Sequence, residues 1–557
     1  MKIRFALAVL TIMSVISCEK FSPAGDVAGK EEAGNGVRVE LQASLHQDTK
    51  ATLTETGKVS WEMLDKIAVH TSKGAVKTFD MFALEENVAK FSTVLSTGEK
   101  PSDLAIFPAA DFRSMTDGVA TIRYPYTYTY QENKMNAPMA SVVGEDGNLY
   151  FKHLGGMIRV VCPYVPAKAA TFNLVARDNV NSKDLKIVGD FTLSPGNNMA
   201  IVTEQSSGYN TTIVKFDASD ALTSKTFDIP IPTGAYPSIY AYFADADGNK
   251  IREWQVLEDV AVKRGDMYIR TMPENIMRVM SYNIRFSHSE GDYNQENDPR
   301  KWEARKLVVP GSLANKYFDV MGSQENTTGQ ISDILSNSAM AGYAAVGRSN
   351  HNKDISDKNY DSSFETTAIY YNNSVVQTIE NGTFWYADSY DSYYTGDWYL
   401  GYNMRCCNWA KLKYAGREFY IFNVHLQVNT TEDAKYKEMR LKQIKKVLKK
   451  IKEVSEDYPV ILTGDFNCTP GKEGDAFQWL VAEGTMIEAR SLVRQPHGPY
   501  GTLHYFQADN ATSSRVDHVF INDKFDVQAY WIDNSQQKTL AWESDHNPVI
   551  VDLTFKN

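Results

Sequence analysis

The chain has 557 residues, which is too long for one typical domain and predicts several compact units. Its 43% hydrophobic and 23% charged residues are ordinary for a globular protein, so a sizeable core is expected throughout. The formal net charge of -11 disfavours a protein that binds nucleic acid tightly through a basic surface.

The N-terminus carries the pattern of an export signal. Lys2 and Arg4 precede an apolar stretch at residues 5–16, which is too short to span a bilayer comfortably. The four residues that end in Cys18 resemble the lipobox of bacterial lipoproteins, in which the cysteine becomes the lipidated first residue of the mature chain. We therefore expect a signal peptide at 1–18 and a lipid anchor in the outer membrane, facing the periplasm or the outside. An ordinary signal peptide with an incidental cysteine is the alternative.

The remaining cysteines do not predict a disulfide framework. They are scattered over a long chain, whereas an exported protein that relies on disulfides has a denser, regularly spaced set. No CxxC motif or Cys/His cluster is typical of a zinc site. We therefore expect small core residues or free thiols at Cys162, Cys406, Cys407 and Cys468.

The N-terminal half predicts a tether followed by β structure. Residues 19–35 are rich in Gly, Ala, Glu and Lys, which is typical of a flexible linker. From Val37 onward, short segments alternate apolar and polar residues between turn signals, which predicts β-sandwich structure. The stretches 50–69 and 151–158 resemble the fimbrillin-like domains of Bacteroidota cell-surface proteins, which are paired β-sandwiches.

This resemblance implies one β-sandwich at 36–145 and a second at 146–272. Neither region contains a catalytic constellation, so the first interpretation is a stalk or spacer that raises a C-terminal domain from the membrane. An adhesive or glycan-binding module is the alternative.

The chain changes character at Asn275, after which apolar strands alternate with helical segments. One helix is predicted at 300–316. Another begins near Thr430, where a threonine with an acid three residues later resembles a capping box. This second helix combines an apolar stripe with many lysines, which we interpret as a solvated outer face. Nucleic-acid binding by these lysines is the alternative.

Polar residues close the predicted strands of this C-terminal part. Asn423 and His425 share one face of a strand, and Asp517 shares the face of two apolar residues, where a carboxylate without a partner is costly. Asp465 and Asn467 follow a buried strand, although these residue types are also common turn formers. In chain order, the polar residues of this kind are Asn283, Glu325, His425, Asp465, Asn467, Asp517, Asp545 and His546.

This ordered set resembles the endonuclease/exonuclease/phosphatase superfamily of metal-dependent phosphoesterases, over residues 275–557. The resemblance implies an α/β fold, a four-layered sandwich of two packed mixed sheets with helices outside, and a site where the sheet ends meet. It also implies a hydrolase of phosphate esters. A homologue without activity is the alternative, although none of the catalytic positions is replaced. Asn326 stands where the family commonly has a small apolar residue.

The resemblance also implies a metal site. Glu325 is its principal ligand, with Asn283 and Asp545 nearby, and oxygen ligands without thiols favour Mg²⁺ or Mn²⁺. Whether one or two ions bind is left open. Taken singly, Asn283 could instead cap a strand and Asp517 could pair with Arg515.

The catalytic roles follow from the same resemblance. Asp465 orients or deprotonates the attacking water, and Asn467 binds the phosphate. His546 acts as an acid/base or transition-state donor and is oriented and kept protonated by Asp517. His425 faces the leaving group or the phosphate.

The substrate is less constrained than the chemistry. The segment 384–402 combines Tyr and Trp with acids and few bases, whereas a DNA-binding loop is expected to interleave aromatics with Lys or Arg. These aromatics suit stacking on sugar rings, with Arg348 and Arg405 left for phosphate, or they are surface and core residues. We expect a monomer that cleaves monoesters or diesters of a phosphorylated sugar, glycan, inositol or lipid headgroup. A secreted nuclease and a non-catalytic surface adhesin are the alternatives.

Overall fold

The computed structural model describes residues 36–45, 61–86, 88–131, 137–141, 146–179, 181, 185–193, 201–202, 208–217, 223–287, 298–356, 364–390, 398, 404–428, 434–508 and 514–556. The predicted signal peptide, Cys18 and the tether lie outside these residues, as do the predicted capping box at Thr430 and much of the aromatic segment. In the described part of the chain, no helix is both long and apolar enough to cross a membrane.

The chain divides into two compact units, and the first comprises residues 1–121, 138–153 and 194–200. Its strands close into a barrel in the order β1-β10-β9-β5-β2-β3-β4, where the sequence predicts a sandwich. Trp61 holds the barrel core together, because its ring meets those of Phe91, Phe107 and Phe151 edge-on at 5.2–5.4 Å. Strand β10 belongs to this barrel, so the first unit extends past the boundary predicted near residue 146. The barrel strands are β1 (Gly36–Leu45), β2 (Lys66–Thr71), β3 (Val76–Glu85), β4 (Val88–Ser96), β5 (Pro101–Phe107), β9 (Met139–Ser141) and β10 (Leu149–His153).

The second unit begins with another all-β region, and the division between the units falls within β7 (Val119–Tyr124). One sheet has the order β17-β11-β20 and another the order β19-β18-β12-β16-β8. Their shared core is aromatic, with Phe172 stacked on Phe227 at 4.1 Å and beside Trp254 at 6.1 Å. Two further elements before residue 275 belong to the first unit, β6 (Phe112–Thr116) and the short helix η1 (Ala109–Asp111). Those of the second unit are β8 (Thr127–Thr129), β11 (Gly155–Cys162), β12 (Thr171–Arg177), β13 (Val188–Leu193), β14 (Ile201–Val202), β15 (Gly208–Tyr209), β16 (Thr211–Lys215), β17 (Lys225–Pro232), β18 (Gly234–Ala244), β19 (Lys250–Val262) and β20 (Met267–Thr271).

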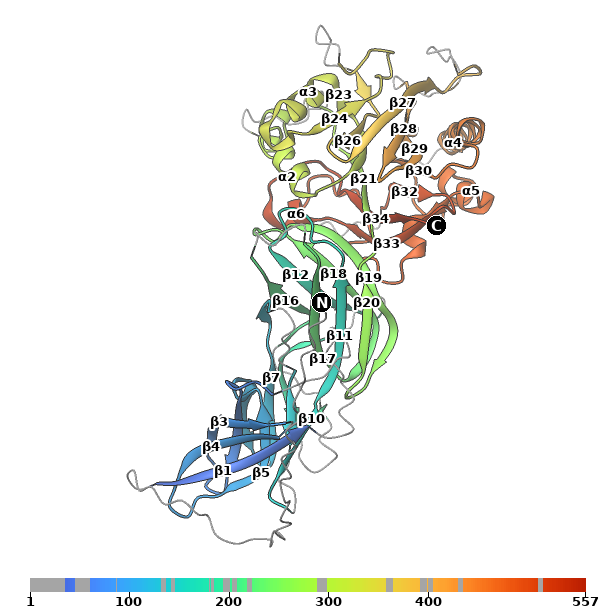
Figure 1. Cartoon of the computed structure of the whole chain (residues 1–557). Coiled ribbons are helices and arrows are strands. Elements are labelled where there is room, and N and C mark those ends of the chain that lie inside the picture. Colours follow the sequence, from blue (N-terminus) through green and yellow to red (C-terminus); the bar gives the residue numbers. More distant parts are fainter. Residues whose placement is uncertain are drawn as a thin grey trace, which may run out of the picture. The chain divides into compact units, whose positions relative to one another are not determined.

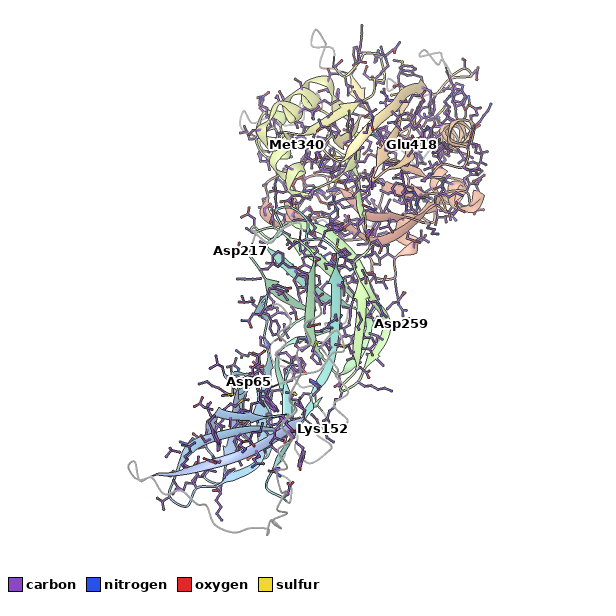
Figure 2. The ribbon with its side chains drawn as sticks, in the orientation of Figure 1. Asp65, Lys152, Asp217, Asp259, Met340 and Glu418 are labelled. Atoms are coloured by element: carbon purple, nitrogen blue, oxygen red, sulfur yellow. The ribbon has the colours of Figure 1, made fainter. Side chains whose placement is uncertain are left out.

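The C-terminal part of the second unit contains two six-stranded sheets that face each other, and Figure 1 shows helices on both outer sides. The first sheet has the order β24-β26-β22-β21-β34-β33 and the second the order β27-β28-β29-β30-β32-β31. Both mix parallel and antiparallel pairs, so the predicted α/β sandwich is present. Side chains fill the space between the ribbons (Figure 2).

The strands of the first sheet are β21 (Met277–Asn283), β22 (Val320–Gln324), β24 (Tyr343–Val346), β26 (Ile369–Asn372), β33 (Phe525–Ile532) and β34 (Val549–Phe555). Those of the second are β27 (Val376–Trp385), β28 (Cys406–Tyr414), β29 (Arg417–His425), β30 (Val460–Asp465), β31 (Ile487–Glu488) and β32 (Asp517–Ile521). A small third pair joins β23 (Asn326–Thr327) and β25 (Glu365–Thr366). The helices are α1 (Trp302–Arg305), α2 (Val309–Asn315), α3 (Thr328–Ser336), η4 (Ser338–Met340), α4 (Ala434–Ser455), α5 (Ala476–Glu483), η6 (Ala489–Leu492) and α6 (Ser535–Thr539).

Alternation along each strand decides which layer a side chain enters. In β29, Ile421 joins the core between the sheets, while Phe422 packs with residues of α4 and α5 on the outer side. Asn423 and His425 continue the inward face, as the alternation predicts. Polar side chains therefore replace apolar ones on the inner face only as the strand nears its end.

The two sheets approach closely at Gly322 in β22. A Cβ at this position would lie 1.9 Å from Thr463 Oγ1 and 2.6 Å from Asn423 Oδ1, so a larger residue would push the sheets apart. Beside the glycine, Asn423 accepts a hydrogen bond from Gln324 Nε2 at 2.7 Å and donates to the Ser323 carbonyl at 2.8 Å. These buried bonds set the spacing of the sheets next to the site.

The helices differ from prediction in two details. The helix predicted at 300–316 is divided into α1 and α2, with Pro310 in the first turn of α2, where a missing N–H is tolerated. The lysines of α4 are not all solvated, because Lys446 is buried with its ammonium 4.2 Å from the centre of the Tyr390 ring. The predicted apolar stripe is buried at Ile444, Val447, Leu448 and Ile451.

Candidate active site

The ends of the two sheets meet at one edge. Strands β29 and β30 are parallel, with His425 opposite Asp465, and β30 is antiparallel to β32, with Asp465 opposite Asp517. In the first sheet, β21 ends at Asn283 beside the end of β22, and Glu325 follows directly. Register alone therefore brings residues that are far apart in the sequence to a common level.

Three residues at this edge have a left-handed backbone. Arg285, Glu325 and Asn467 have φ values of 65°, 60° and 51°. Residues with a Cβ rarely adopt this conformation, and the surrounding structure must enforce it. The strain therefore marks the turns after β21, β22 and β30 as places where side-chain direction is tightly specified.

His546 and Asp517 form a buried pair. Asp517 Oδ2 lies 2.8 Å from His546 Nδ1. Burial by itself lowers the pKa of a histidine, but the carboxylates of Asp517, Asp545 and Asp465 outweigh burial and raise the pKa of His546 to about 10. The imidazole is therefore cationic at neutral pH, with Nδ1–H bound to Asp517 and Nε2–H left to face Asp465.

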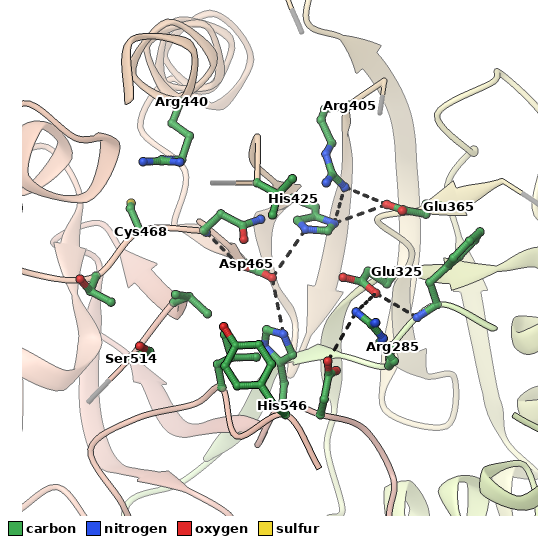
Figure 3. A pocket seen from close by; sticks show the side chains of 18 of the residues that line it. Arg285, Glu325, Glu365, Arg405, His425, Arg440, Asp465, Cys468, Ser514 and His546 are labelled. Carbon is green, nitrogen blue, oxygen red and sulfur yellow. Dashed lines mark hydrogen bonds and ion pairs between the residues drawn. The ribbon is translucent and has the colours of Figure 1, made fainter. Parts of the chain in front are cut away.

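Asp465 lies between two histidines (Figure 3). Its Oδ2 is 3.6 Å from His425 Nε2 and 4.0 Å from His546 Nε2, and its Oδ1 accepts a hydrogen bond from the Asn467 N–H at 2.8 Å. Burial, together with the Asp517 carboxylate, raises the pKa of Asp465 above its usual value in spite of the histidines. A carboxylate with a raised pKa is a stronger base than an ordinary aspartate, which suits removal of a proton from water.

Arg405 contacts both His425 and a second carboxylate, that of Glu365. Arg405 Nη1 lies 2.8 Å from Glu365 Oε2 and 2.6 Å from His425 Nδ1, while Glu365 Oε2 is 3.6 Å from the same ring nitrogen. Arginine only donates, so His425 Nδ1 accepts and the hydrogen-bond network assigns the ring proton to Nε2. Both histidines thus direct an Nε2–H toward Asp465.

Glu325 and Asp545 form the other side of the site. Glu325 accepts hydrogen bonds from Asn283 Nδ2 at 3.0 Å and from the Phe286 N–H at 2.9 Å. Arg285 Nη1 lies 3.8 Å from Glu325 Oε2 and 3.5 Å from Asp545 Oδ2. Burial opposes ionisation of Glu325, but nearby positive charge, Arg285 foremost, and the Asn283 hydrogen bond lower its pKa to about 2.

These residues fit a divalent cation. The ligand atoms of Glu325, His425 and Asp465 lie within 4.8 Å of one another, and the set is dominated by carboxylate oxygens, which Mg²⁺ and Mn²⁺ prefer. A positive charge, that of Arg285, already faces both Glu325 and Asp545. The Asn283 side chain donates hydrogen bonds from Nδ2 to Glu325 and Asp465, and its Oδ1 accepts one from the Arg285 N–H at 2.9 Å.

A pocket of about 510 Å³ opens over this arrangement. Asn283 and Asp517 lie fully buried behind it. Figure 3 shows Arg285 and Glu325 on one side of Asp465 and Arg440 with Cys468 on the other. The predicted residues that line the pocket are Glu325, Arg405, His425, Asp465, Asn467, Asp545 and His546.

Two arginines have different surroundings from those predicted. Arg348 does not line the pocket, and its guanidinium instead donates to Asn352 and lies 3.5 Å from Asp354. We therefore assign it no contact with phosphate. Arg515 pairs with Glu488, so the alternative of a structural ion pair between Arg515 and Asp517 is removed. Asp517 keeps His546 as its partner.

Among the pocket residues that sequence reasoning missed, four bear on the site, namely Glu365, Arg440, Tyr505 and Arg285. Glu365 lies in a strand of two residues, too short to show any periodicity, and Arg440 lies on a helix face among other basic residues. Tyr505 follows no strand pattern. Arg285 alone had a usable signal, since it comes two residues after Asn283.

Comparison with known proteins identifies this part of the chain. Residues 280–546 match the model of the Endonuclease/Exonuclease/phosphatase family. The C-terminal domain is an endonuclease/exonuclease/phosphatase family domain. A search of curated proteins finds no match to the chain.

Several solved structures are similar to this endonuclease/exonuclease/phosphatase domain. One is an endonuclease/exonuclease/phosphatase family protein from Bacteroides thetaiotaomicron, with 27% identity, coverage of 51% of this chain and 98% of that chain, and a TM-score of 0.43. Another is a mannosyl-6-phosphatase from the same species, with 26% identity, coverage of 50% and 100%, and a TM-score of 0.42. The catalytic domain of human Nocturnin has 18% identity, coverage of 51% and 95%, and a TM-score of 0.38.

Proposed function

We propose that the chain is a divalent-metal-dependent phosphoesterase that hydrolyses a phosphate ester of a sugar, glycan, inositol or lipid headgroup. The observation that carries the proposal is Asp465, a buried carboxylate of raised pKa with an Nε2 of each histidine 3.6–4.0 Å from its Oδ2. Hydrolysis of a phosphate ester needs a base for the attacking water and donors for the developing negative charge. The site offers both within one pocket.

Glu325 and Asp545 would hold the ion, Mg²⁺ or Mn²⁺, and Asn283 orients the Glu325 carboxylate through its amide at 3.0 Å. When bound, such an ion neutralises charge on the phosphoryl oxygens. Arg285 faces the same two carboxylates, and its guanidinium would turn toward the phosphate when the ion supplies their positive charge.

The remaining groups act on protons and on orientation. Asp465 Oδ2 takes a proton from the attacking water, and cationic His546 donates through Nε2 to a phosphoryl oxygen. His425, with Nδ1 occupied by Arg405, offers its Nε2–H to the phosphate or the leaving oxygen. One amide hydrogen of Asn467 is bound to the Leu426 carbonyl at 3.0 Å, which leaves the other for the phosphate.

The proposal includes the cell envelope. The pattern that ends in Cys18 supports a lipid anchor in the outer membrane, the β regions before residue 275 serve as a spacer, and the protein acts as a monomer. Fatty-acid labelling of cells that express the full chain tests the anchor. Label is expected in the wild-type protein and none in Cys18→Ser; equal labelling of both contradicts the anchor.

A substrate panel tests the chemistry. The purified protein is assayed with a bis-aryl phosphodiester, an aryl phosphomonoester and plasmid DNA, each with Mg²⁺ and with chelator. Metal-dependent release of the aryl group is expected, and Asp465→Asn serves as the matched inactive control. Turnover of none of the three compounds rejects the enzyme in favour of a binding protein. Efficient nicking of plasmid without turnover of the small esters favours a secreted nuclease.

A further inference from the structure

Tyr505 is a large aromatic side chain with most of its surface in the pocket mouth. It is 59% exposed and lines the same pocket as Asp465, Asp545 and His546. The ring is exposed although the preceding residue, His504, is only 1% exposed. The ring offers an apolar face next to the position of the phosphate.

The backbone around Tyr505 is held in a costly conformation. Tyr505 and Phe506 have φ values of 52° and 57°, a region that favours glycine and is an outlier for bulky residues. The conformation persists because the loop is fastened to the catalytic segment, with the N–H groups of His504 and Tyr505 bound to the Asp545 carbonyl at 2.9 and 3.1 Å. The position of the Tyr505 ring is thereby tied to the position of the active-site carboxylate.

Packing on the far side of the loop fixes it further. The His504 ring stacks on Trp542 at 5.6 Å, and the Phe506 ring meets Trp542 edge-on at 5.8 Å. Both neighbours of Tyr505 therefore point their rings at the same tryptophan, while Tyr505 itself lines the pocket. A pre-positioned aromatic ring loses little entropy when a ligand covers it.

The charges of the pocket argue against a polyanionic strand as the ligand. Arg440 lies 2.6 Å from Asp475, Arg405 lies 2.8 Å from Glu365, and Arg285 faces two carboxylates. These three arginines of the pocket thus already lie next to carboxylates. A protein that binds a nucleic-acid backbone instead presents a row of basic groups to the phosphates. The lining in the described residues instead includes hydrogen-bonding groups suited to hydroxyls, at Asn467, Thr469 and Ser514.

We propose that Tyr505 is a specificity-determining residue, whose ring stacks on the sugar ring of a hexose phosphate while the phosphate lies at Asp465 and His546. This inference rests on the proposed function and narrows its substrate class to a ring-bearing sugar phosphate. The volume of about 510 Å³ suits one such molecule. The aromatic face covers the apolar side of the ring, and the polar lining meets its hydroxyls.

A matched pair of substrates tests the proposal. Glucose 6-phosphate and glycerol 3-phosphate are both primary phosphomonoesters with free hydroxyls, and they differ in the ring. Tyr505→Ala is expected to lower kcat/KM for glucose 6-phosphate about tenfold and to leave glycerol 3-phosphate within about twofold. Tyr505→Phe is expected to keep both values within about twofold, because the ring and not the hydroxyl makes the contact. Equal losses on both substrates, no loss on either, or a Tyr505→Phe variant as poor as Tyr505→Ala overturns the proposal.

The controls separate this inference from the proposed function. Tyr209→Ala removes a tyrosine of similar exposure, 64%, that lies outside the pocket, and no change in kinetics is expected. Tyr505→Asn, which tolerates a left-handed backbone, replaces the alanine variant if that variant does not fold. Turnover of the aryl esters but not of glucose 6-phosphate overturns the assignment to a hexose phosphate and leaves the proposed function standing. If the wild type turns over none of the panel compounds, the proposed function fails, and calorimetric binding of glucose 6-phosphate to metal-free protein decides the role of Tyr505. A tenfold weaker affinity in Tyr505→Ala supports it, and unchanged affinity or no binding to the wild type overturns it. Preferred, Tyr505-dependent binding of adenosine 5′-monophosphate also overturns the assignment to a sugar.

Discussion

Strand β21 has the buried Arg278 near its start and the candidate active site at its end, and buried charges are arranged differently at the two places. Near the start, Arg278 donates two hydrogen bonds to Asp552, both at 2.8 Å, and its remaining nitrogen donates to two carbonyl oxygens. At the other end, Asn283 donates to both Glu325 and Asp465, and Arg285 Nη1 lies 3.8 Å from Glu325 Oε2. We call the surroundings of Arg278 the paired end of this strand and the surroundings of Asn283 its catalytic end.

The paired end has a cation for every buried acid named there. The pairs are Arg278 with Asp552, Arg252 with Asp319, and Arg177 with Glu253. The catalytic end instead gathers five carboxylates around two arginines and two histidines, at Glu325, Glu365, Asp465, Asp517, Asp545, Arg285, Arg405, His425 and His546.

The difference teaches how one fold separates stability from reactivity. Matched pairs hold buried charge in place. At the catalytic end, neighbouring carboxylates raise the pKa of His546, burial and Asp517 raise the pKa of Asp465, and Arg285 with the histidines lowers the pKa of Glu325. A base and a cationic donor can then coexist at neutral pH. Changes at the two ends should therefore have opposite consequences.

The largest effect is expected from the catalytic end. Asp465→Asn removes the base, and His546→Ala removes the cationic donor, so each should lower kcat roughly a thousandfold. The melting temperature of Asp465→Asn should stay near that of the wild type or rise, because a crowded carboxylate loses its charge, whereas that of His546→Ala should fall, because Asp517 is left buried without its partner. Steady-state kinetics and thermal melts measure both, with the exposed Asp526→Asn as a control. Loss of folding in either variant would mean that the residue is structural.

The paired end should respond in the opposite way. Arg278→Met leaves Asp552 buried without its partner, so the free energy of unfolding should fall by about 3–5 kcal/mol. Activity per folded molecule should be unchanged. Denaturant titration measures the loss, and the double variant with Asp552→Leu should recover most of it, since an apolar pair replaces an ionic one. A single variant as stable as the wild type contradicts the distinction between the two ends.

Stabilisation by a metal ion should depend on residues of the catalytic end alone. Mg²⁺ at about one hundred times its Kd should stabilise the folded wild type by about 2.7 kcal/mol, because the ion binds the folded site. Glu325→Gln should lose this effect, whereas Asp465→Asn should largely keep it. Thermal melts with Mg²⁺ and with chelator measure the shift independently of turnover. Equal shifts in all three proteins remove Glu325 from the metal site.

Glu365 should have a smaller effect, through His425. Glu365→Gln weakens the hold on Arg405 and thus on the histidine, and kcat should fall roughly tenfold. Its effect on KM should be slight, since Glu365 contacts the histidine and not the reacting atoms. Glu380→Gln on the exposed face of β27 is the matched control. A rise in KM without a change in kcat would assign Glu365 to binding instead.

The smallest effect concerns pH at the paired end. Burial, then the charges of Arg177 and Lys250, lower the pKa of His497 to about 4. The folded state therefore keeps the ring neutral while the unfolded chain takes up a proton below about pH 6.5, so this stability is present above 6.5 and lost toward pH 4. Between pH 7 and 5.5 the loss should stay below about 1 kcal/mol, because His497 is exposed and solvent screens the neighbouring charges. Denaturant titrations of wild type and His497→Gln measure it, and parallel pH profiles contradict it.

Much of the site was predictable because its signals are local. Alternation along β29, β30 and β32 depends only on neighbouring residues, so the inward direction of His425, Asp465 and Asp517 could be inferred from the sequence. The two packed sheets with helices outside were implied by the resemblance to the endonuclease/exonuclease/phosphatase superfamily, and alternation alone did not predict them. A buried acid with no partner in its own strand also predicted that another segment would supply one, and His546 does.

Contacts between distant segments were decided only by the tertiary structure. The partner of Arg405 is Glu365, in a strand too short to show a pattern, and Arg348 turns to its own loop. The closure of the first strands into a barrel depends on the pairing of β1 with β10, more than a hundred residues apart. The position of Tyr505 depends on a left-handed turn fastened to the Asp545 carbonyl. Periodicity gives the direction of a side chain within its strand, but register, loop path and sheet packing decide what it meets, because those depend on the whole chain at once.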